Sequence, residues 1–387
     1  MNVVTKQLSG SCGSSHVRTP ANGLKVTPDI RIRGTNDVRD RIACALSAKT
    51  ASVTVDRYGY NKSRLAVCSS GKWKGKKLFA KILLANPYPI PPRFRAPWET
   101  PRDATIPVRA ITDQIDAEWN MTLKMRALSG GDSVPAPLGR SQAARTVVWE
   151  EAGGISLIQA LKWSRWKSAI PAAGDQALFR AGTWLRNVHE ASRRGTEIIE
   201  ARDLVQTASR LAGQKERAAW YYESMAAKIL ETALPEMGDK GKFSVAVALT
   251  HGDFCLSNLL WDVTGKGLAV IDFELSDFRP VFYDLFALIA DLRSGLLNPL
   301  IPKSVIHSWE ESFWRGYGPV SRQVTAFVKA LALARVFYYH FSRLLTRRER
   351  KGLIGGFNAQ LYRTFLEGRI IAQRLDLPQE LAAHHDD

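Results

Sequence analysis

The sequence predicts an α+β protein of two lobes, in which a small antiparallel β lobe precedes a large and mainly helical lobe. Short segments rich in Val, Leu and Ile gather before residue 153 with turn residues between them, whereas helical periodicity dominates after Leu157. The chain has 387 residues, of which 45% are hydrophobic, so it is long and apolar enough to bury a sizeable hydrophobic core. We therefore expect a mobile basic tail over 1–34, the β-rich lobe over 35–152 and the helical lobe over 153–387.

The elements of the small lobe follow from the spacing of its apolar residues. Apolar side chains recur on one helical face at 36–49, and three short β-type segments then follow, which is typical of an antiparallel meander. Residues 86–107 hold seven of the 18 prolines and predict an extended surface insert, because proline interrupts helices and central strands. In order, we expect a helix over 36–49, strands over 52–58, 64–69 and 77–84, the insert, a helix over 111–128 and a strand over 145–150.

The large lobe is predicted from long segments of helical period with one interruption. Residues 257–273 are typical of a β-hairpin, because two short apolar segments flank turn residues at 264–267. The expected helices cover 174–192, 197–232, 281–293 and 320–345.

Net charge is the unusual bulk property of this chain. It carries 54 Lys and Arg against 37 Asp and Glu, a net charge of +17, and residues 1–100 hold 18 basic against five acidic residues. A field of that sign concentrates anions, so the N-terminal quarter is a candidate for contact with an anionic surface. A role in solubility explains the same charge equally well.

Other bulk features exclude whole classes of protein. No run of 18 uncharged apolar residues occurs, and the N-terminus has no apolar run of signal-peptide length, so we expect no transmembrane segment and a cytoplasmic location. The four cysteines lie far apart with no CxxC pair, which argues against a structural zinc site and a disulfide framework.

Residues 251–260 and 271–274 carry the most informative pattern. The first segment is HGDFCLSNLL and the second is IDFE, with the predicted hairpin between them. Asp253 and Asn258 can project from one tight loop, and the hairpin returns Asp272 to face them. Phosphoryl transfer needs such groups, because a carboxylate accepts the proton of the nucleophile and oxygen ligands hold magnesium against the phosphates.

These two motifs resemble the aminoglycoside phosphotransferase and choline kinase family, the small-molecule branch of the protein-kinase-like fold. HGDFCLSNLL is similar to the family's HGDxxxxN loop, and IDFE is similar to its metal motif. The resemblance implies that Asp253 is the catalytic base, that Asn258 and Asp272 are magnesium ligands, and that His251 is structural. Glu274 either reaches a second magnesium ion through water or is a surface carboxylate.

The resemblance extends over most of residues 50–300 and includes a lysine in the small lobe. Lys81 is a cation inside an apolar strand, which costs stability unless an anion meets it, and it corresponds to the family's phosphate-binding lysine. Its expected partner is Glu118 on the helix after the insert. Asp116 or Asp113 would take the same role if that helix were rotated slightly.

The resemblance also implies two structural residues and a nucleotide pocket. Asp284 resembles the buried Asp that ties the next helix to the catalytic loop, and His189 resembles a helix histidine that we expect to be packed in the core. The remaining candidates for nucleotide binding are Glu150, Glu151 and Ala152 at the hinge, and Gly59 and Ser63 in the loop that would cover the phosphates. That loop has one glycine and no GxGxxG, so it departs from the usual phosphate cradle.

The resemblance implies an ATP- and Mg²⁺-dependent phosphotransferase that acts on a hydroxyl of a small-molecule or sugar-containing acceptor. The alternative is a catalytically weak, nucleotide-binding adaptor that docks on an anionic partner, which the intact set of Asp253, Asn258, Asp272 and Lys81 disfavours. A protein kinase acting on Ser or Thr is not supported, because the HRD, DFG and APE signatures are missing. The basic net charge favours a sugar, lipid-linked sugar or phosphorylated acceptor over a polycationic antibiotic.

Overall fold

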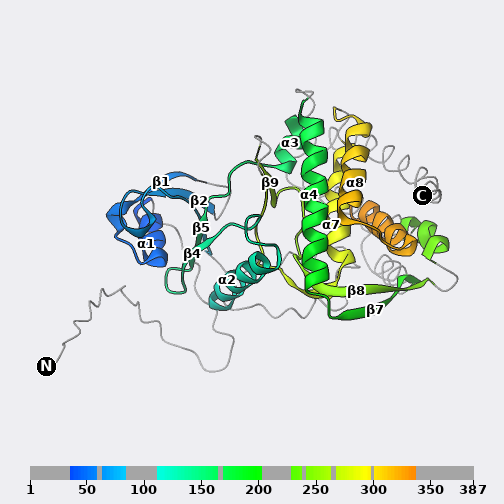
Figure 1. Cartoon of the computed structure of the whole chain (residues 1–387), viewed down its shortest axis with the longest axis horizontal. Coiled ribbons are helices and arrows are strands. Elements are labelled where there is room, and N and C mark those ends of the chain that lie inside the picture. Colours follow the sequence, from blue (N-terminus) through cyan, green and yellow to red (C-terminus); the bar gives the residue numbers. More distant parts are fainter. Residues whose placement is uncertain are drawn as a thin grey trace, which may run out of the picture.

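The computed structural model confirms the predicted α+β fold with two lobes. It describes residues 35–58, 63–83, 111–163, 169–202, 228–237, 241–262, 267–297 and 300–336. The small lobe carries α1 and an antiparallel sheet, and the large lobe carries the long helices α4, α7 and α8 (Figure 1). The division between the lobes at residues 152 and 153 stays a prediction.

The small lobe is built on a sheet that has five strands in the described residues, in the order β1-β2-β3-β5-β4. All neighbouring strands are antiparallel, so the predicted meander is confirmed and one further strand, β4, joins it. The elements are α1 (Thr35–Leu46), β1 (Val53–Tyr58), β2 (Ser63–Cys68), β3 (Lys77–Ile82), α2 (Ile111–Leu128), β4 (Pro137–Ser141) and β5 (Thr146–Glu150), with 3₁₀ turns at Thr50–Ser52 and Gly71–Trp73.

The two faces of this sheet pack against different helices. Leu78, Ala80 and Ile82 of β3 share a buried cluster with Val38 and Ile42 of α1. Side chains alternate along a strand, so the intervening residues Phe79 and Lys81 face the opposite side, where Phe79 packs in a cluster with Ile115 of α2. The period of β3 therefore directs Lys81 toward α2.

The large lobe packs its helices around α4. Helix α4 lies along α8 (Figure 1), and most of the helical residues 322–336 are buried in the same core as α7. Its other elements are β6 (Ile155–Ser156), α3 (Leu157–Trp163), α4 (Ala169–Ala191), β9 (Leu259–Trp261), β10 (Leu268–Val270), α7 (Phe282–Ser294) and α8 (Lys303–Tyr317), with 3₁₀ turns at Leu234–Met237 and Gly295–Leu297. Strands β9 and β10 pair antiparallel, which confirms the predicted hairpin, and β6 adds to β9.

The helix predicted over 197–232 is wrong at its start. Gly195–Glu200 forms strand β7, which pairs with β8 (Lys242–Thr250). Strand β8 also pairs with β11 (Asp277–Pro280), so the described part of this lobe holds a second three-stranded sheet, in the order β11-β8-β7. Of the remaining residues in the predicted helix, 201–202 and 228–232 are helical, and 203–227 lie outside the described ranges.

Some predictions concern residues outside the described ranges. These are the tail over 1–34, the proline-rich insert over 86–107 and the loop residue Gly59. Among the helices that the structure describes, none has the length and apolar character that crossing a membrane requires.

Candidate active site

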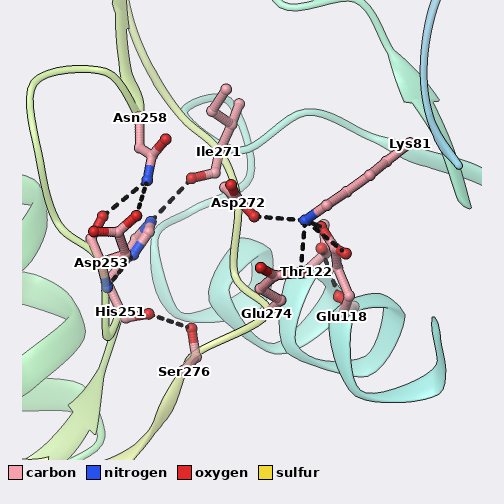
Figure 2. A network of polar contacts seen from close by, with 10 residues as sticks. All are labelled: Lys81, Glu118, Thr122, His251, Asp253, Asn258, Ile271, Asp272, Glu274 and Ser276. Carbon is pink, nitrogen blue, oxygen red and sulfur yellow. Dashed lines mark hydrogen bonds and ion pairs between the residues drawn. The ribbon is translucent and has the colours of Figure 1, made fainter. Parts of the chain in front are cut away.

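Lys81 pairs with two carboxylates of the large lobe and with one of its own lobe. Its Nζ lies 2.7 Å from Asp272 Oδ1 and 3.0 Å from Glu274 Oε2, both in the large lobe, and 3.2 Å from Glu118 Oε1 on α2. Figure 2 shows the lysine reaching toward all three side chains. Sequence reasoning placed Lys81 with Glu118, and the structure brings these two together as expected.

Helix α2 presents Glu118 to the lysine and turns Asp116 elsewhere. Asp116 pairs with Arg140 at 2.9 Å and accepts a hydrogen bond from Gln142, both outside the lysine cluster. Glu118 is almost fully buried, and Thr122 one turn later donates to its backbone carbonyl. The alternative partner Asp116 is therefore excluded by the rotation of the helix.

Burial and charge oppose each other in this cluster. Burial of Lys81 lowers its pKa, but the charges of the three carboxylates raise the pKa by more than burial lowers it. The pKa of Lys81 therefore lies well above the ordinary value of a lysine. Burial raises the pKa of Glu118 to about 7, although the Lys81 ammonium acts in the opposite direction. The lysine is therefore a fixed positive charge at neutral pH, and it stabilises the ionised form of its partners.

The loop after β8 holds Asp253 and Asn258 together. Asn258 Nδ2 donates to the Asp253 carboxylate at 3.1 Å and to the Asp253 backbone carbonyl at 2.9 Å. Burial and the charge of Asp272 raise the pKa of Asp253, against the effects of His251, Arg335 and Asn258. A carboxylate with a raised pKa is a better proton acceptor than an ordinary aspartate.

His251 fixes the shape of this loop from inside the core. Its Nδ1 accepts a hydrogen bond from the Asp253 backbone N–H at 3.3 Å, so the proton of the neutral ring is on Nε2, which donates to the Ile271 carbonyl at 3.0 Å. Gly252 has φ +84°, and a Cβ there would lie 2.1 Å from the Leu275 carbonyl oxygen. The backbone path therefore requires glycine at position 252, and the prediction that His251 is structural agrees with these contacts.

Asp284 ties helix α7 to the same loop. It is fully buried and accepts hydrogen bonds from the backbone N–H groups of His251 and Gly252, at 2.7 and 2.9 Å. His189 Nε2 on α4 donates to the same carboxylate at 3.1 Å, and His189 Nδ1 lies 2.9 Å from the Tyr317 hydroxyl. Burial opposes the charge of Asp284, but the hydrogen bond and charge of His189 outweigh it and lower the pKa of the carboxyl.

Asp272 stands at a strained point where the chain leaves strand β10. Its φ is +74°, a left-handed conformation that costs a residue with a side chain roughly 1 kcal/mol. In the view of Figure 2, Asp272 lies between Lys81 and the pair of Asp253 and Asn258. This backbone conformation directs the carboxylate of Asp272 to Lys81.

The donor set fits a magnesium site that is completed by phosphate. Mg²⁺ is usually bound by one or two protein carboxylates together with substrate phosphates and water. Asp272 and Glu274 can supply carboxylate oxygens. The side-chain nitrogen of Asn258 donates to Asp253, so the side-chain oxygen of Asn258 is the atom that could bind a metal ion. No group of three or more His, Cys, Asp or Glu side chains within the described residues is arranged to hold a metal ion without such help.

The predicted nucleotide-binding residues are brought together only in part. Ser63 is the first residue of β2 and lies opposite Lys81 of β3 in the sheet register. Glu150 ends β5 and pairs with Lys76 at 2.6 Å, and the Glu151 backbone N–H donates to the Lys77 carbonyl.

The hinge residues line a cavity. Glu150, Glu151, Ala152 and Gly153 line a cavity of about 360 Å³ together with Asp262 and 267–269, and its lining does not include Lys81 or Asp272.

Two supporting residues escaped sequence reasoning. Ser276 Oγ donates to the His251 backbone carbonyl at 3.0 Å, and Asp291 accepts a hydrogen bond from the Leu256 backbone N–H at 2.8 Å. Asp291 follows Asp284 by seven residues on α7, which places both on one helical face. That spacing is the signal that could have identified Asp291, whereas Ser276 has no comparable signal.

Comparison with known proteins gives a family match and several similar structures. The model of the phosphotransferase enzyme family matches residues 115–329. A comparison with curated protein sequences found no match.

Among solved structures, an aminoglycoside phosphotransferase from Alicyclobacillus acidocaldarius is 13% identical, with a TM-score of 0.49 over 88% of this chain and 96% of that chain. A choline/ethanolamine kinase family protein from Mesorhizobium loti is 17% identical, with a TM-score of 0.48 over 90% and 98%. A choline kinase from Streptococcus pneumoniae is 16% identical, with a TM-score of 0.44 over 86% and 98%.

Proposed function

The chain belongs to the phosphotransferase enzyme family, and from this membership we propose that it is an ATP- and Mg²⁺-dependent kinase for a hydroxyl group of a small-molecule or sugar-containing acceptor. The family match confirms the resemblance seen in the sequence motifs. One observation carries the proposal: Lys81 of the small lobe meets Asp272 of the large lobe at 2.7 Å, beside the loop that holds Asp253 and Asn258. Phosphoryl transfer needs these groups together, and an adaptor would not need Asp253.

Asp253 is the proposed proton acceptor. Its Oδ2 accepts the hydrogen bond from Asn258, so we assign the proton of the acceptor hydroxyl to Oδ1. The raised pKa of this buried carboxyl favours proton transfer, and the backbone contacts of His251 hold the loop in place. Asp253 thus orients the hydroxyl and removes its proton as the bond to phosphorus forms.

Lys81 is the proposed contact for the phosphate oxygens of ATP. Glu118 and the strand β3 fix its side chain from the small lobe, so the ammonium lies at the junction of the two lobes. Asp272, Glu274 and Asn258 would hold Mg²⁺, which would neutralise the charge of the phosphates. Ser63, Gly59 and the hinge residues Glu150, Glu151 and Ala152 remain proposed contacts for the rest of the nucleotide.

The proposal is tested first by finding the acceptor and then by removing the base. A library of alcohols, sugars and phosphorylated sugars is screened for ADP release. With any active acceptor, Asp253→Asn should lower kcat by ~10²-fold or more, the usual scale for a lost general base. Binding of an ATP analogue should stay within about threefold of the wild type, because Asp253 handles the acceptor and not the nucleotide.

The matched control is Asp277→Asn, which removes an exposed carboxylate of strand β11 and leaves the loop intact. This variant should keep full activity. Turnover near the wild-type value in Asp253→Asn would remove Asp253 from the role of base. Binding of Mg-ATP without turnover on any acceptor would favour the adaptor alternative.

A further inference from the structure

Trp184 of α4 packs on two phenylalanines, Phe254 and Phe273. Each of them directly follows a proposed site residue in the chain, Asp253 in one case and Asp272 in the other. We propose that Trp184 is a positioning residue, which sets the place of Asp253 relative to Asp272 without touching a substrate. The inference rests on the proposed function, since it assumes that Asp253 is the base and Asp272 a metal ligand.

The first support is the geometry of the ring contacts. The Trp184 ring is stacked on Phe254, with ring centroids 5.8 Å apart and an interplanar angle of 3°. The ring of Phe273 lies 6.4 Å from that of Trp184, at an angle of 31°. Aromatic pairs at such distances attract each other beyond the effect of the area that they bury. One side chain of α4 therefore joins the loop of Asp253 to the segment of Asp272.

The second support is that this aromatic cluster is closed to solvent. Trp184 is 6% exposed, Phe254 is 0% exposed and Phe273 is 2% exposed. The ring of His251 packs on both phenylalanines, at 5.7 and 4.9 Å between centroids. A close-packed interior passes a change of volume on to its neighbours. A smaller side chain at position 184 should therefore shift one or both phenylalanines, and with them the carboxylates that precede them.

The third support is that tryptophan is costly at this position. Among the described residues, the Trp184 Nε1–H group is buried and has no hydrogen-bond partner. A buried donor without an acceptor destabilises the fold, and phenylalanine would avoid that cost. A local cost of this kind is typical of functional sites. The size of the indole ring, which reaches both phenylalanines, is therefore the property that matters here, and its N–H group is not.

The experiment separates positioning from stability. Trp184→Phe makes the ring smaller but removes the unpaired N–H, so its unfolding midpoint should stay near that of the wild type. With an acceptor found in the screen, kcat should fall ~10-fold or more, because a displacement of about 1 Å at the reacting groups can cost ~10²-fold. The KM for the acceptor should stay within about threefold of the wild type, since the proposed effect is on the transition state. Both proteins are assayed well below their unfolding midpoints, where unfolded protein does not lower kcat.

The matched control is Trp309→Phe. Trp309 of α8 is a 0% exposed tryptophan of the same core, and its ring lies against Gly174. Gly174 precedes Trp184 by ten residues on α4, which is about 15 Å along a helix. The control should lower the unfolding midpoint and keep the wild-type kcat. If Trp184→Phe does not fold, Trp184→Met replaces it, because the flexible side chain of methionine fills irregular space.

A double variant tests whether Trp184 acts through its neighbour. Phe273→Leu removes one of the two ring contacts and should itself lower kcat. Adding Trp184→Phe to this variant should lower kcat by a smaller factor than it does in the wild type, because residues that act through one contact are not additive.

The outcomes separate this inference from the proposed function. A wild-type kcat in the Trp184 variants overturns the positioning role while the kinase proposal stands. An equal fall of kcat in Trp309→Phe also overturns it, because the loss would then follow from core packing in general. If the wild type turns over no acceptor in the screen, the proposed function fails and the inference fails with it. A fall of kcat confined to the Trp184 variants, and smaller in the Phe273→Leu background, supports the proposal.

Discussion

Asp284 is the residue on which the proposed catalytic loop depends most. Its two oxygens accept from the backbone N–H groups of His251 and Gly252, and from the His189 ring. Three donors converge on one buried carboxylate, so the ionised form is strongly favoured. Because Asp284 contacts the residues just before Asp253, it sets the position of the proposed base without touching a substrate.

Asp284→Asn should therefore destabilise the protein and change its response to acid. The asparagine NH₂ would face a backbone donor, and leaving such a group unpaired in the core costs roughly 1–3 kcal/mol. The pKa of Asp284 is lowered in the folded state. As the pH falls, this carboxylate is therefore protonated in the unfolded chain before it is protonated in the folded protein. This contribution to stability is complete above about pH 4 and is lost as the pH falls toward the folded-state pKa.

Urea unfolding of both proteins between pH 7 and pH 3 tests this prediction. The variant should be less stable at pH 7, and its stability should fall less steeply below about pH 4. Glu311→Gln, at an exposed position of α8, serves as the control and should follow the wild-type curve. Parallel curves for Asp284→Asn and wild type would show that Asp284 does not carry the pH dependence.

Several residues of the site were predictable because a polar or charged side chain in an apolar segment must find a partner when it is buried. A lysine inside an apolar strand requires an anion, and the structure supplies Glu118 along with Asp272 and Glu274. The rotation of α2, which excluded Asp116, was not predictable from spacing alone. It depends on the contacts of Asp116 with Arg140 and Gln142, which lie on β4 and in the turn after it.

At the scale of elements, helices α4 and α8 place His189 and Tyr317 by packing backbone against backbone. A Cβ at Gly182 of α4 would lie 2.2 Å from the Phe313 carbonyl oxygen and 2.6 Å from the Tyr317 amide nitrogen. A Cβ at Gly316 of α8 would in turn lie 2.0 Å from the Phe179 carbonyl oxygen. The two glycines therefore set how closely the helices approach.

Gly182→Ala should force these helices apart. Alanine gains roughly 0.5–1 kcal/mol of helix preference over glycine, but overpacking typically costs about 1–3 kcal/mol, and the atoms it meets are backbone and cannot rotate away. We expect a net loss of stability, measured as a lower midpoint of thermal unfolding. Asn187→Ala, at an exposed position of α4, is the control and should unfold near the wild-type temperature. A midpoint raised by Gly182→Ala would show that the helices can shift without cost.

Elements were predicted well where one period dominates and poorly where tertiary pairing decides. The meander and the β9–β10 hairpin came from runs of apolar residues between turn sequences, and the structure has them. Strand β7 was hidden because GTEIIE adjoins a long helical pattern, and its pairing with β8 depends on residues more than 40 positions away. The sheet of β7, β8 and β11 was therefore missed as a whole.

At the scale of the whole molecule, the two lobes meet through charge and through apolar packing, since Met125 of α2 lies in the same buried cluster as the core of the large lobe. Lys81 of the small lobe pairs with Asp272 and Glu274 of the large lobe, and the Val270 backbone N–H donates to the Ser133 carbonyl at 2.8 Å. All the charged residues of the proposed site lie at position 81 or beyond. Most of the excess positive charge comes earlier in the sequence, since residues 1–80 hold 15 basic and four acidic residues.

The segment over 1–34, predicted to be a basic tail, contributes to that excess. Its charged residues are Lys6, Arg18, Lys25, Arg31, Arg33 and Asp29, so deletion removes a net charge of +4. If the tail docks on an anionic surface, the deletion should weaken binding to vesicles of acidic phospholipid by roughly 1 kcal/mol per basic residue in contact, and flatten the salt dependence. Phosphoryl transfer should persist, because the proposed site residues remain.

A full-length variant with the five basic residues changed to Gln separates charge from length. It should lose vesicle binding as the deletion does, since the attraction depends on charge and is screened by salt. Vesicle sedimentation at low and high salt measures the binding, and ADP release measures the activity. Unchanged binding in both variants would leave the positive charge of the tail with a role in solubility alone, and the rest of the N-terminal quarter as the remaining candidate for anion contact.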